Sequence, residues 1–268
     1  MLGCGQVVRH RFLVSAFAGS IPATPAIFCI IGTIEEASLL GFPFFASFQK
    51  MADMRIAIYD LDKTLTRRAT FTPFLVFAAR RIAPWRLVLL PIWAAMMLGY
   101  RAGLIDRTAL KTGGMRLMFG RTDIADLERA GRQFAERRAQ GDGFLPATLA
   151  LLDEDRKSGS CIVIATAAFE FYARAFADLL QIDTVIGSQW DGRFMPGGNC
   201  YGETKLARVR DWAEQADISL EKASLRFVSD SFADTPLLDL ADDPVFISSS
   251  AAKRVRAEAL GWRVISAD

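Results

Sequence analysis

Two aspartates stand directly after a run of strand-forming residues in the stretch IAIYDLDKTLT, residues 56–66. Asp60 and Asp62 are separated by a single leucine, so we expect their carboxylates to lie close together. Two like charges about 4 Å apart repel each other by on the order of 4 kcal/mol at an effective dielectric constant of roughly 20. The sequence therefore predicts that something positively charged, a metal ion or a basic side chain, lies beside this pair.

Four later residues with ionisable or hydroxyl side chains complete the set that could do chemistry. Each follows a predicted strand or lies on the helix entering one: Thr166, Lys205, Asp230 and Asp234. If all the strand ends meet at one edge, this pocket holds four carboxylates, one lysine and one hydroxyl group. Since four acids outweigh one lysine, a hard divalent cation is needed, and oxygen ligands alone favour Mg²⁺ over zinc or copper.

The counts of other residue types exclude several kinds of site. The single histidine, His10, lies in an N-terminal stretch that we do not expect to join the fold, which argues against a Ser-His-Asp triad or a multi-histidine metal site. The four cysteines form no CxxC pair, so we expect no disulfide framework or structural zinc site, and a reducing, cytoplasmic compartment fits. A net charge of +2 gives no reason to expect a nucleic-acid partner.

The elements that must position these residues alternate between strands and helices. Short runs rich in strand-forming residues are predicted as strands: 55–59, 161–165, 184–187, 225–229, 244–248 and 263–266. Amphipathic helical patterns separate the later runs, which indicates an α/β fold with a parallel, doubly wound sheet and helices on both faces. Such sheets place their chemistry beyond the carboxyl ends of the strands, where we expect Asp60 and Asp62.

The stretch between the first two predicted strands is roughly a hundred residues long, which is too long for a single crossover. It contains helical patterns at 72–83, 84–100 and 122–140. We therefore interpret 67–143 as an inserted helical cap domain, with a core domain formed by 51–66 and 144–268. Residues 1–50 are expected to be an extension outside the fold, the alternative being a targeting or membrane-contact segment.

These residues, in this order, resemble the haloacid dehalogenase (HAD) superfamily of phosphatases from residue 54 to residue 268. Asp60-Leu61-Asp62-Lys63-Thr64 matches the DxDxT motif, and the second, third and fourth motifs are matched by Thr166, Lys205 and the pair Asp230 and Asp234. The resemblance implies a Rossmann-like sheet with a type I cap at the inserted position. NCYGETK and SDSFAD are similar to subfamily IB, the branch that contains phosphoserine phosphatase and related lipid-phosphate phosphatases.

For the first motif, the resemblance implies a catalytic pair and a metal site. Asp60 would be the nucleophile that forms an aspartyl-phosphate. Asp62 would protonate the leaving alcohol and later deprotonate the attacking water. Mg²⁺ would be held by Asp60, Asp230 and the backbone carbonyl of Asp62, where it offsets the repulsion between the phosphate dianion and the nucleophile.

The other motif residues are implied to bind the phosphoryl group of the substrate. Lys205 would neutralise negative charge on Asp60 and on the transferring group, and Thr166 would hydrogen-bond a phosphoryl oxygen. Asp234 would orient Lys205 or a metal-bound water. The resemblance thus implies a Mg²⁺-dependent phosphatase that hydrolyses a phosphate monoester.

The cap segment is where the substrate must be sought. Phosphoserine phosphatases carry a glutamate shortly after the first motif that binds the amino group of the substrate, but TRRATFTPF, residues 66–74, contains no acid. Ala69 stands near the expected place, and Arg67 and Arg68 would repel an ammonium group. The expected substrate is a small phosphomonoester or the phosphate of a lipid head group, and phosphoserine phosphatase remains an alternative.

Segment 84–100 leads to a further hypothesis. Residues 87–98 are apolar on every side, and the tryptophans and flanking arginines would suit a helix that lies at the level of lipid head groups. This pattern resembles phosphatidylglycerophosphatase C, so we expect peripheral contact with the inner face of the membrane. The alternative is packing against other cap helices or a second subunit. From another class, a non-enzymatic membrane-associated phosphate-binding protein would fit the same residues.

Overall fold

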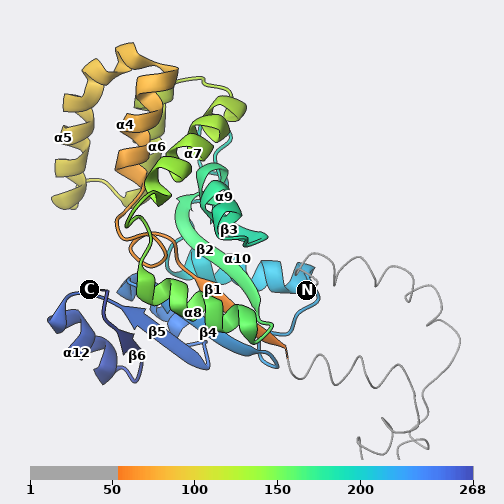
Figure 1. Cartoon of the computed structure of the whole chain (residues 1–268). Coiled ribbons are helices and arrows are strands. Elements are labelled where there is room, and N and C mark those ends of the chain that lie inside the picture. The colour runs from red at the N-terminus through yellow and green to blue at the C-terminus, as the bar shows by residue number, and fades with distance from the viewer. Residues whose placement is uncertain (1–53, 268) are drawn as a thin grey trace, which may run out of the picture.

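The computed structural model of the chain describes residues 54–267 (Figure 1). The predictions for residues 1–50, including that for His10, lie outside the described residues. The described strands form one sheet in the order β3-β2-β1-β4-β5-β6. Their bounds are β1 Arg55–Tyr59, β2 Cys161–Phe169, β3 Thr184–Ser188, β4 Ser224–Ser229, β5 Asp243–Ile247 and β6 Arg263–Ile265. This sheet confirms the predicted α/β fold.

Strand β1 lies inside the sheet, between two strands that are distant from it in sequence. It pairs with β2 in a register that sets Ile56 against Cys161, and with β4 in a register that sets Ile56 against Leu225. The remaining pairs of neighbouring strands in the sheet are also parallel. The carboxyl ends of the strands therefore lie along one edge of the sheet, as the position of the aspartate pair requires.

Helices cover both faces of the sheet. The core helices are α8 (Pro146–Lys157), α9 (Glu170–Leu179), α10 (Glu203–Gln215), η2 (Phe232–Asp234), α11 (Thr235–Leu238) and α12 (Ala251–Ala259). Ala57 and Tyr59 of β1 belong to one apolar cluster with buried residues of α8 and α9. Ile56 and Ile58 belong to a second cluster with residues of α10, α11 and α12. Because both faces are covered, β1 is an almost uninterrupted apolar run.

A helical unit follows β1 and ends before α8 (Figure 1). Its elements are α4 (Phe71–Ile82), η1 (Pro84–Leu89), α5 (Leu90–Arg101), α6 (Arg107–Phe119) and α7 (Ile124–Ala139). It occupies the interval that we interpret as the cap domain. Among residues 54–267, no helix is long and apolar enough to cross a membrane.

The cap differs from the sequence prediction in two places. Helix α6 was not predicted, because Gly113 and Gly114 interrupt its pattern; a Cβ on Gly114 would lie 2.7 Å from the ring of Trp93 on α5. The single helix predicted over 84–100 is instead a 3₁₀ turn followed by α5. Pro91 lies in the first turn of α5, where its missing amide hydrogen costs least, so a new helix starts there.

An aromatic cluster joins the cap to the core. Phe74 of α4 stacks on Tyr172 of α9 with ring centroids 4.6 Å apart, and it meets Phe134 of α7 at 5.6 Å. Neither Phe74 nor Tyr172 has any exposed surface. Helices α7 and α9 approach closely, since a Cβ on Gly131 would lie 2.9 Å from Cβ of Tyr172. Buried apolar contact thus holds the cap against the core.

The substitution Phe74→Ala tests this junction. We expect it to lower the free energy of unfolding by about 3–5 kcal/mol, since it leaves a cavity among buried rings. Urea denaturation followed by circular dichroism measures the change. Leu104→Ala, at a side chain that is 80% exposed, is the matched control and should change stability by less than about 0.5 kcal/mol. Equal effects of the two substitutions would contradict the packing described.

Candidate active site

Asp60 stands immediately after β1, at the edge where the strands end. Its amide donates a hydrogen bond to the carbonyl of Val228 in β4 at 2.9 Å, so the neighbouring strand fixes its backbone. The chain then turns tightly: Lys63 has φ 59°, in the left-handed region, and the amide of Thr66 donates to the carbonyl of Leu61 at 2.9 Å. An apolar strand thereby ends in a turn that carries both aspartates of the first motif.

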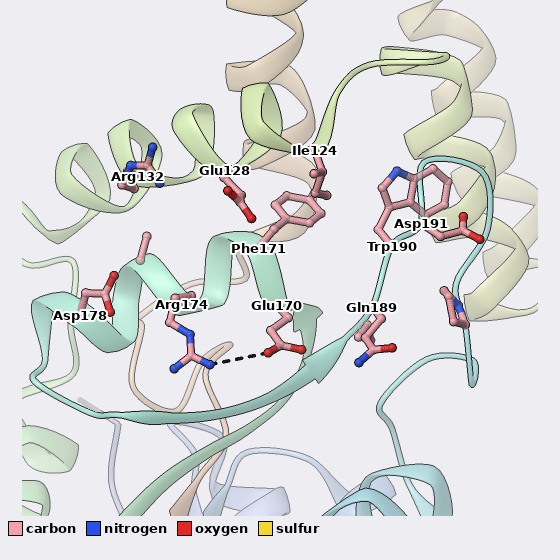
Figure 2. A pocket seen from close by; sticks show the side chains of 13 residues that line it. Ile124, Glu128, Arg132, Glu170, Phe171, Arg174, Asp178, Gln189, Trp190 and Asp191 are labelled. Carbon is pink, nitrogen blue, oxygen red and sulfur yellow. Dashed lines mark ion pairs between the residues drawn. The ribbon is translucent and has the colours of Figure 1, made fainter. Parts of the chain in front are cut away.

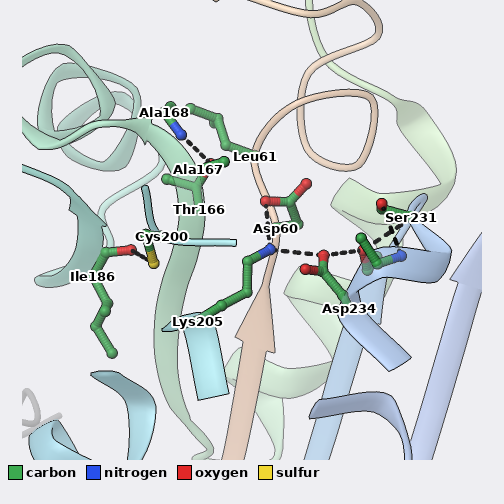
Figure 3. A network of polar contacts seen from close by, with 12 residues as sticks. Asp60, Leu61, Thr166, Ala167, Ala168, Ile186, Cys200, Lys205, Ser231 and Asp234 are labelled. Atoms are coloured by element: carbon green, nitrogen blue, oxygen red, sulfur yellow. Dashed lines mark hydrogen bonds and ion pairs between the residues drawn. The ribbon is translucent and has the colours of Figure 1, made fainter. Parts of the chain in front are cut away.

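Lys205 supplies the positive charge that the sequence predicts beside the aspartate pair (Figure 3). Its ammonium nitrogen lies 3.1 Å from Oδ1 of Asp60 and 2.7 Å from Oδ2 of Asp234, and only 1% of the residue is exposed. The hydroxyl of Ser229 donates to the same Asp234 oxygen at 2.7 Å. The structure therefore brings together three predicted site residues from β1, α10 and the segment after β4.

The charges of this cluster shift its pKa values. Burial raises the pKa of Asp60 to about 7, and neighbouring carboxylates add to the rise, although Lys205 opposes it. Burial alone would lower the pKa of Lys205, but Asp60 and Asp234 outweigh burial and raise it well above its usual range. Burial also raises the pKa of Asp230, against the opposing charge of Lys63. The negative charge of the carboxylates therefore exceeds the positive charge that Lys205 supplies.

Asp62 is held by a residue at the entrance to the cap. The amide and the hydroxyl of Thr70 donate to Oδ1 of Asp62 at 2.8 and 2.7 Å. Thr70 is buried at the N-terminus of α4, and its hydroxyl lies 3.3 Å from that of Tyr172. Sequence reasoning missed Thr70, because its contact depends on the chain folding back eight residues after the motif.

Thr166 is fully buried, but its strand does not end where the sequence predicts. Strand β2 continues to Phe169, and its register against β3 shifts between Ala165 and Phe169. Within this irregular stretch the amide of Ala168 donates to Oγ1 of Thr166 at 3.1 Å. The prediction that the strand ends at residue 165 is therefore wrong, because small residues allow an irregular stretch inside the strand. The amide contact leaves the Thr166 hydroxyl hydrogen free for another acceptor.

A divalent cation fits the chemistry of this site. Asp60 and Asp230 both have raised pKa values, and Oδ1 of Asp234 is buried without a hydrogen-bond partner. No three His, Cys, Asp or Glu side chains in residues 54–267 are grouped so that they could hold a metal by themselves. The predicted Mg²⁺ site therefore depends on the carboxylates of Asp60 and Asp230 and on the backbone carbonyl of Asp62. It stays a prediction.

Two basic residues of α6, Arg107 and Lys111, also lie near the carboxylates of the candidate site, and sequence reasoning missed both. The ammonium group of Lys111 donates to the carbonyl of Ala167 and, at 3.0 Å, to Oδ1 of Asn199. Burial lowers the pKa of Lys111 to about 8, a shift that Asp62 opposes and Arg107 enhances. The i, i+4 spacing of Arg107 and Lys111 was a signal that they share one helix face. It was overlooked because α6 itself was not predicted.

A groove of about 510 Å³ lies elsewhere, between α7, α9 and the end of β3 (Figure 2). Its lining mixes acidic and basic side chains, and Glu170 and Arg174 pair across 3.6 Å. It contains none of the predicted site residues. The clustered charges around Lys205, rather than this groove, are therefore the candidate active site.

The family comparison agrees with this location. The model of the family described as haloacid dehalogenase-like hydrolase matches residues 57–239, which include every residue of the candidate site, and the chain belongs to this family. Histidinol-phosphatase from Neisseria meningitidis serogroup C (strain 8013) is 29% identical over 131 residues. That match covers 45% of this chain and 58% of the length of the relative.

Solved structures share the fold. A protein of unknown function from Bordetella pertussis Tohama I has a TM-score of 0.69 at 22% identity, over 81% of this chain and 100% of that one. A HAD family hydrolase from Salmonella enterica serovar Typhi has a TM-score of 0.57 at 17% identity, over 90% of this chain and 76% of the other. A phospho-aspartyl intermediate analogue of phosphoserine phosphatase has a TM-score of 0.51 at 12% identity, over 81% of this chain and 94% of that one. These likenesses concern the fold.

The raised pKa of Asp60 predicts a pH-dependent effect of Asp60→Asn on the metal-free protein. The pKa of the Asp60 carboxyl rises from 3.8 to about 7 on folding. Between pH 3.8 and about 7, this carboxyl therefore binds more protons in the native state than in the unfolded state. Its stabilising contribution is complete below pH 3.8 and is lost as the pH rises through about 7. Asp60→Asn should therefore raise the melting temperature at pH 8 by at least about 2 °C, and by less at pH 5.

Thermal melts in the presence of a chelator measure this difference. Asp153→Asn, which removes an exposed carboxylate of α8, is the control and should show no such pH dependence. If Asp60→Asn raised the melting temperature over that of wild type by less at pH 8 than at pH 5, the electrostatic description would be wrong.

Proposed function

We propose that the protein is a Mg²⁺-dependent phosphatase that hydrolyses phosphate monoesters through an aspartyl-phosphate intermediate. The observation that carries this proposal is the buried contact of Lys205 with Asp60 and Asp234 at the carboxyl edge of the sheet. Membership of a hydrolase family supports it, as does a relative named as a phosphatase.

In the first step, a carboxylate oxygen of Asp60 attacks phosphorus, and the bond from phosphorus to the ester oxygen breaks. The bonding electron pair stays on the leaving oxygen, to which Asp62 donates a proton, so an alcohol leaves. Both hydrogen bonds from Thr70 use Oδ1 of Asp62, which leaves Oδ2 to carry this proton.

In the second step, Asp62 removes a proton from water as the water oxygen attacks the phosphorus of the aspartyl-phosphate. The bond between phosphorus and Asp60 breaks, which releases inorganic phosphate and restores the carboxylate. Lys205 neutralises that carboxylate, and the hydroxyl of Thr166 donates to a phosphoryl oxygen. When bound, Mg²⁺ supplies positive charge that offsets the repulsion between the phosphate dianion and Asp60.

Turnover of p-nitrophenyl phosphate tests this proposal. We expect the wild type to hydrolyse it with Mg²⁺ and to lose activity after chelation. Asp60→Asn should lower kcat by at least about 10³-fold, because the nucleophile is gone. Asp239→Asn, which changes an aspartate at the end of α11 outside the candidate site, is the control and should keep wild-type kcat. Undiminished turnover by the Asp60→Asn variant would overturn the proposed mechanism, and a stable wild type without turnover would favour a non-enzymatic phosphate-binding protein.

The substrate that we propose is a small phosphomonoester or the phosphate of a lipid head group. The lipid hypothesis is supported by apolar side chains at the surface of the cap, each at least half exposed: Trp85, Val88, Ile92, Leu98 and Leu104. Arg101 at the end of α5 would suit anionic lipid head groups. Phosphoserine phosphatase is less well supported, because basic residues lie near the catalytic carboxylates where its ammonium group would need an acid.

Binding to vesicles that contain anionic lipid tests contact with a membrane surface. The double substitution Val88→Ser and Ile92→Ser should reduce co-sedimentation by at least about tenfold, since it removes exposed apolar area from the cap. Leu260→Ser, at an exposed apolar residue of the core domain, is the matched control and should bind like wild type. If the wild type does not co-sediment and its activity is unchanged by vesicles, the lipid hypothesis is wrong.

A further inference from the structure

The inner face of α6 places two basic side chains one helical turn apart beside the proposed site of phosphoryl transfer. Lys111 and Arg107 are both partly or fully buried, and Lys111 has a relative exposure of 7%. Neither forms an ion pair with a carboxylate in the described part of the chain. The two residues nevertheless have different surroundings, which give them different roles.

The ammonium group of Lys111 donates its hydrogen bonds to residues of the core domain. It donates to the carbonyl of Ala167, the residue after Thr166, and to Oδ1 of Asn199 at 3.0 Å. Its ammonium nitrogen also lies 5.4 Å from the ring centres of Phe71 and Phe169, within the range of a cation–π contact. Lys111 therefore acts as a positioning residue that fixes α6 against the core.

Arg107, by contrast, keeps donors for another partner. Its guanidinium carbon lies 4.1 Å from the ring centre of Tyr201, whose chain leads through Gly202 into the helix of Lys205. Burial alone would lower the pKa of Arg107, but Tyr100, Tyr201 and Asp234 lie near enough to raise it. A guanidinium has five N–H donors, and stacking on a ring leaves those at its edge available.

The geometry points to Arg107 as the residue that selects a substrate with a second anionic group on its leaving alcohol. This inference rests on the proposed phosphatase function and narrows its substrate class. The scissile phosphate is assigned to Lys205, Thr166 and Mg²⁺, so Arg107 is free to bind a carboxylate or phosphodiester carried by the leaving group. The planar fork of arginine suits both, and Tyr201 keeps it in place.

A matched series of substrates tests this selection. Each set has a chain of two to four carbons that carries one phosphate monoester and ends in a carboxylate, a hydroxyl or an ammonium group. We expect kcat/KM of the wild type to be at least about tenfold higher for the carboxylate than for the hydroxyl, and lowest for the ammonium. Arg107→Gln should abolish the preference for carboxylate, and Arg107→Glu should reverse it in favour of ammonium.

Activity on p-nitrophenyl phosphate, which lacks a second anion, separates this role from a structural one. Arg107→Gln should lose at least about tenfold more kcat/KM on the carboxylate substrate than on p-nitrophenyl phosphate, whereas Arg137→Gln, at an exposed arginine of α7, should stay within about threefold of wild type for every substrate. An equal loss on all substrates in the Arg107 variants, or a wild type without preference, would overturn the inference. If the wild type hydrolyses none of them, the proposed function fails and the inference falls with it.

Discussion

A buried lysine between two buried carboxylates is the interaction on which the rest of this site depends. Lys205 lies 3.1 Å from Asp60 and 2.7 Å from Asp234. Removing Lys205 would leave both carboxylates uncompensated in the interior, and the loss of one partner from a buried ion pair typically costs about 3–5 kcal/mol. The three charges therefore constrain one another, and the fold must keep β1, α10 and the segment after β4 in a fixed relation.

The parallel sheet meets this constraint by joining distant parts of the chain. Pairing of β1 with both β2 and β4 sets Asp60 beside Thr166 and beside the segment that carries Asp230 and Asp234. The cap then closes the same edge: Thr70, at its entrance, holds Asp62, and α6 brings further basic residues toward the carboxylates. Sheet and cap together produce a buried site that remains rich in negative charge, which would favour binding of a cation.

Much of this arrangement could be predicted from local sequence. Strand patterns located all the described strands. Asp60 and Asp234 follow two of these strands and Lys205 lies on the helix before β4, so their meeting could be expected because parallel strands end at a common edge. Contacts made only in three dimensions could not be predicted. Gly113 and Gly114 weaken the helical pattern of α6 in the sequence. Their role becomes visible only in the structure, where they allow α6 to pack closely against side chains of α5. The contact of Thr70 with Asp62 likewise depends on the way the cap folds back.

The central claim is that Asp60 itself becomes phosphorylated during turnover. The most direct measurement uses a ³²P-labelled phosphomonoester with Asp62→Asn, a variant expected to slow attack by water on the intermediate. After an acid quench, peptide mapping locates the label. The account predicts phosphate bound to the peptide that contains Asp60, and no label in an Asp60→Asn protein. Continued hydrolysis with label on another residue, or with no covalent label at all, would contradict it.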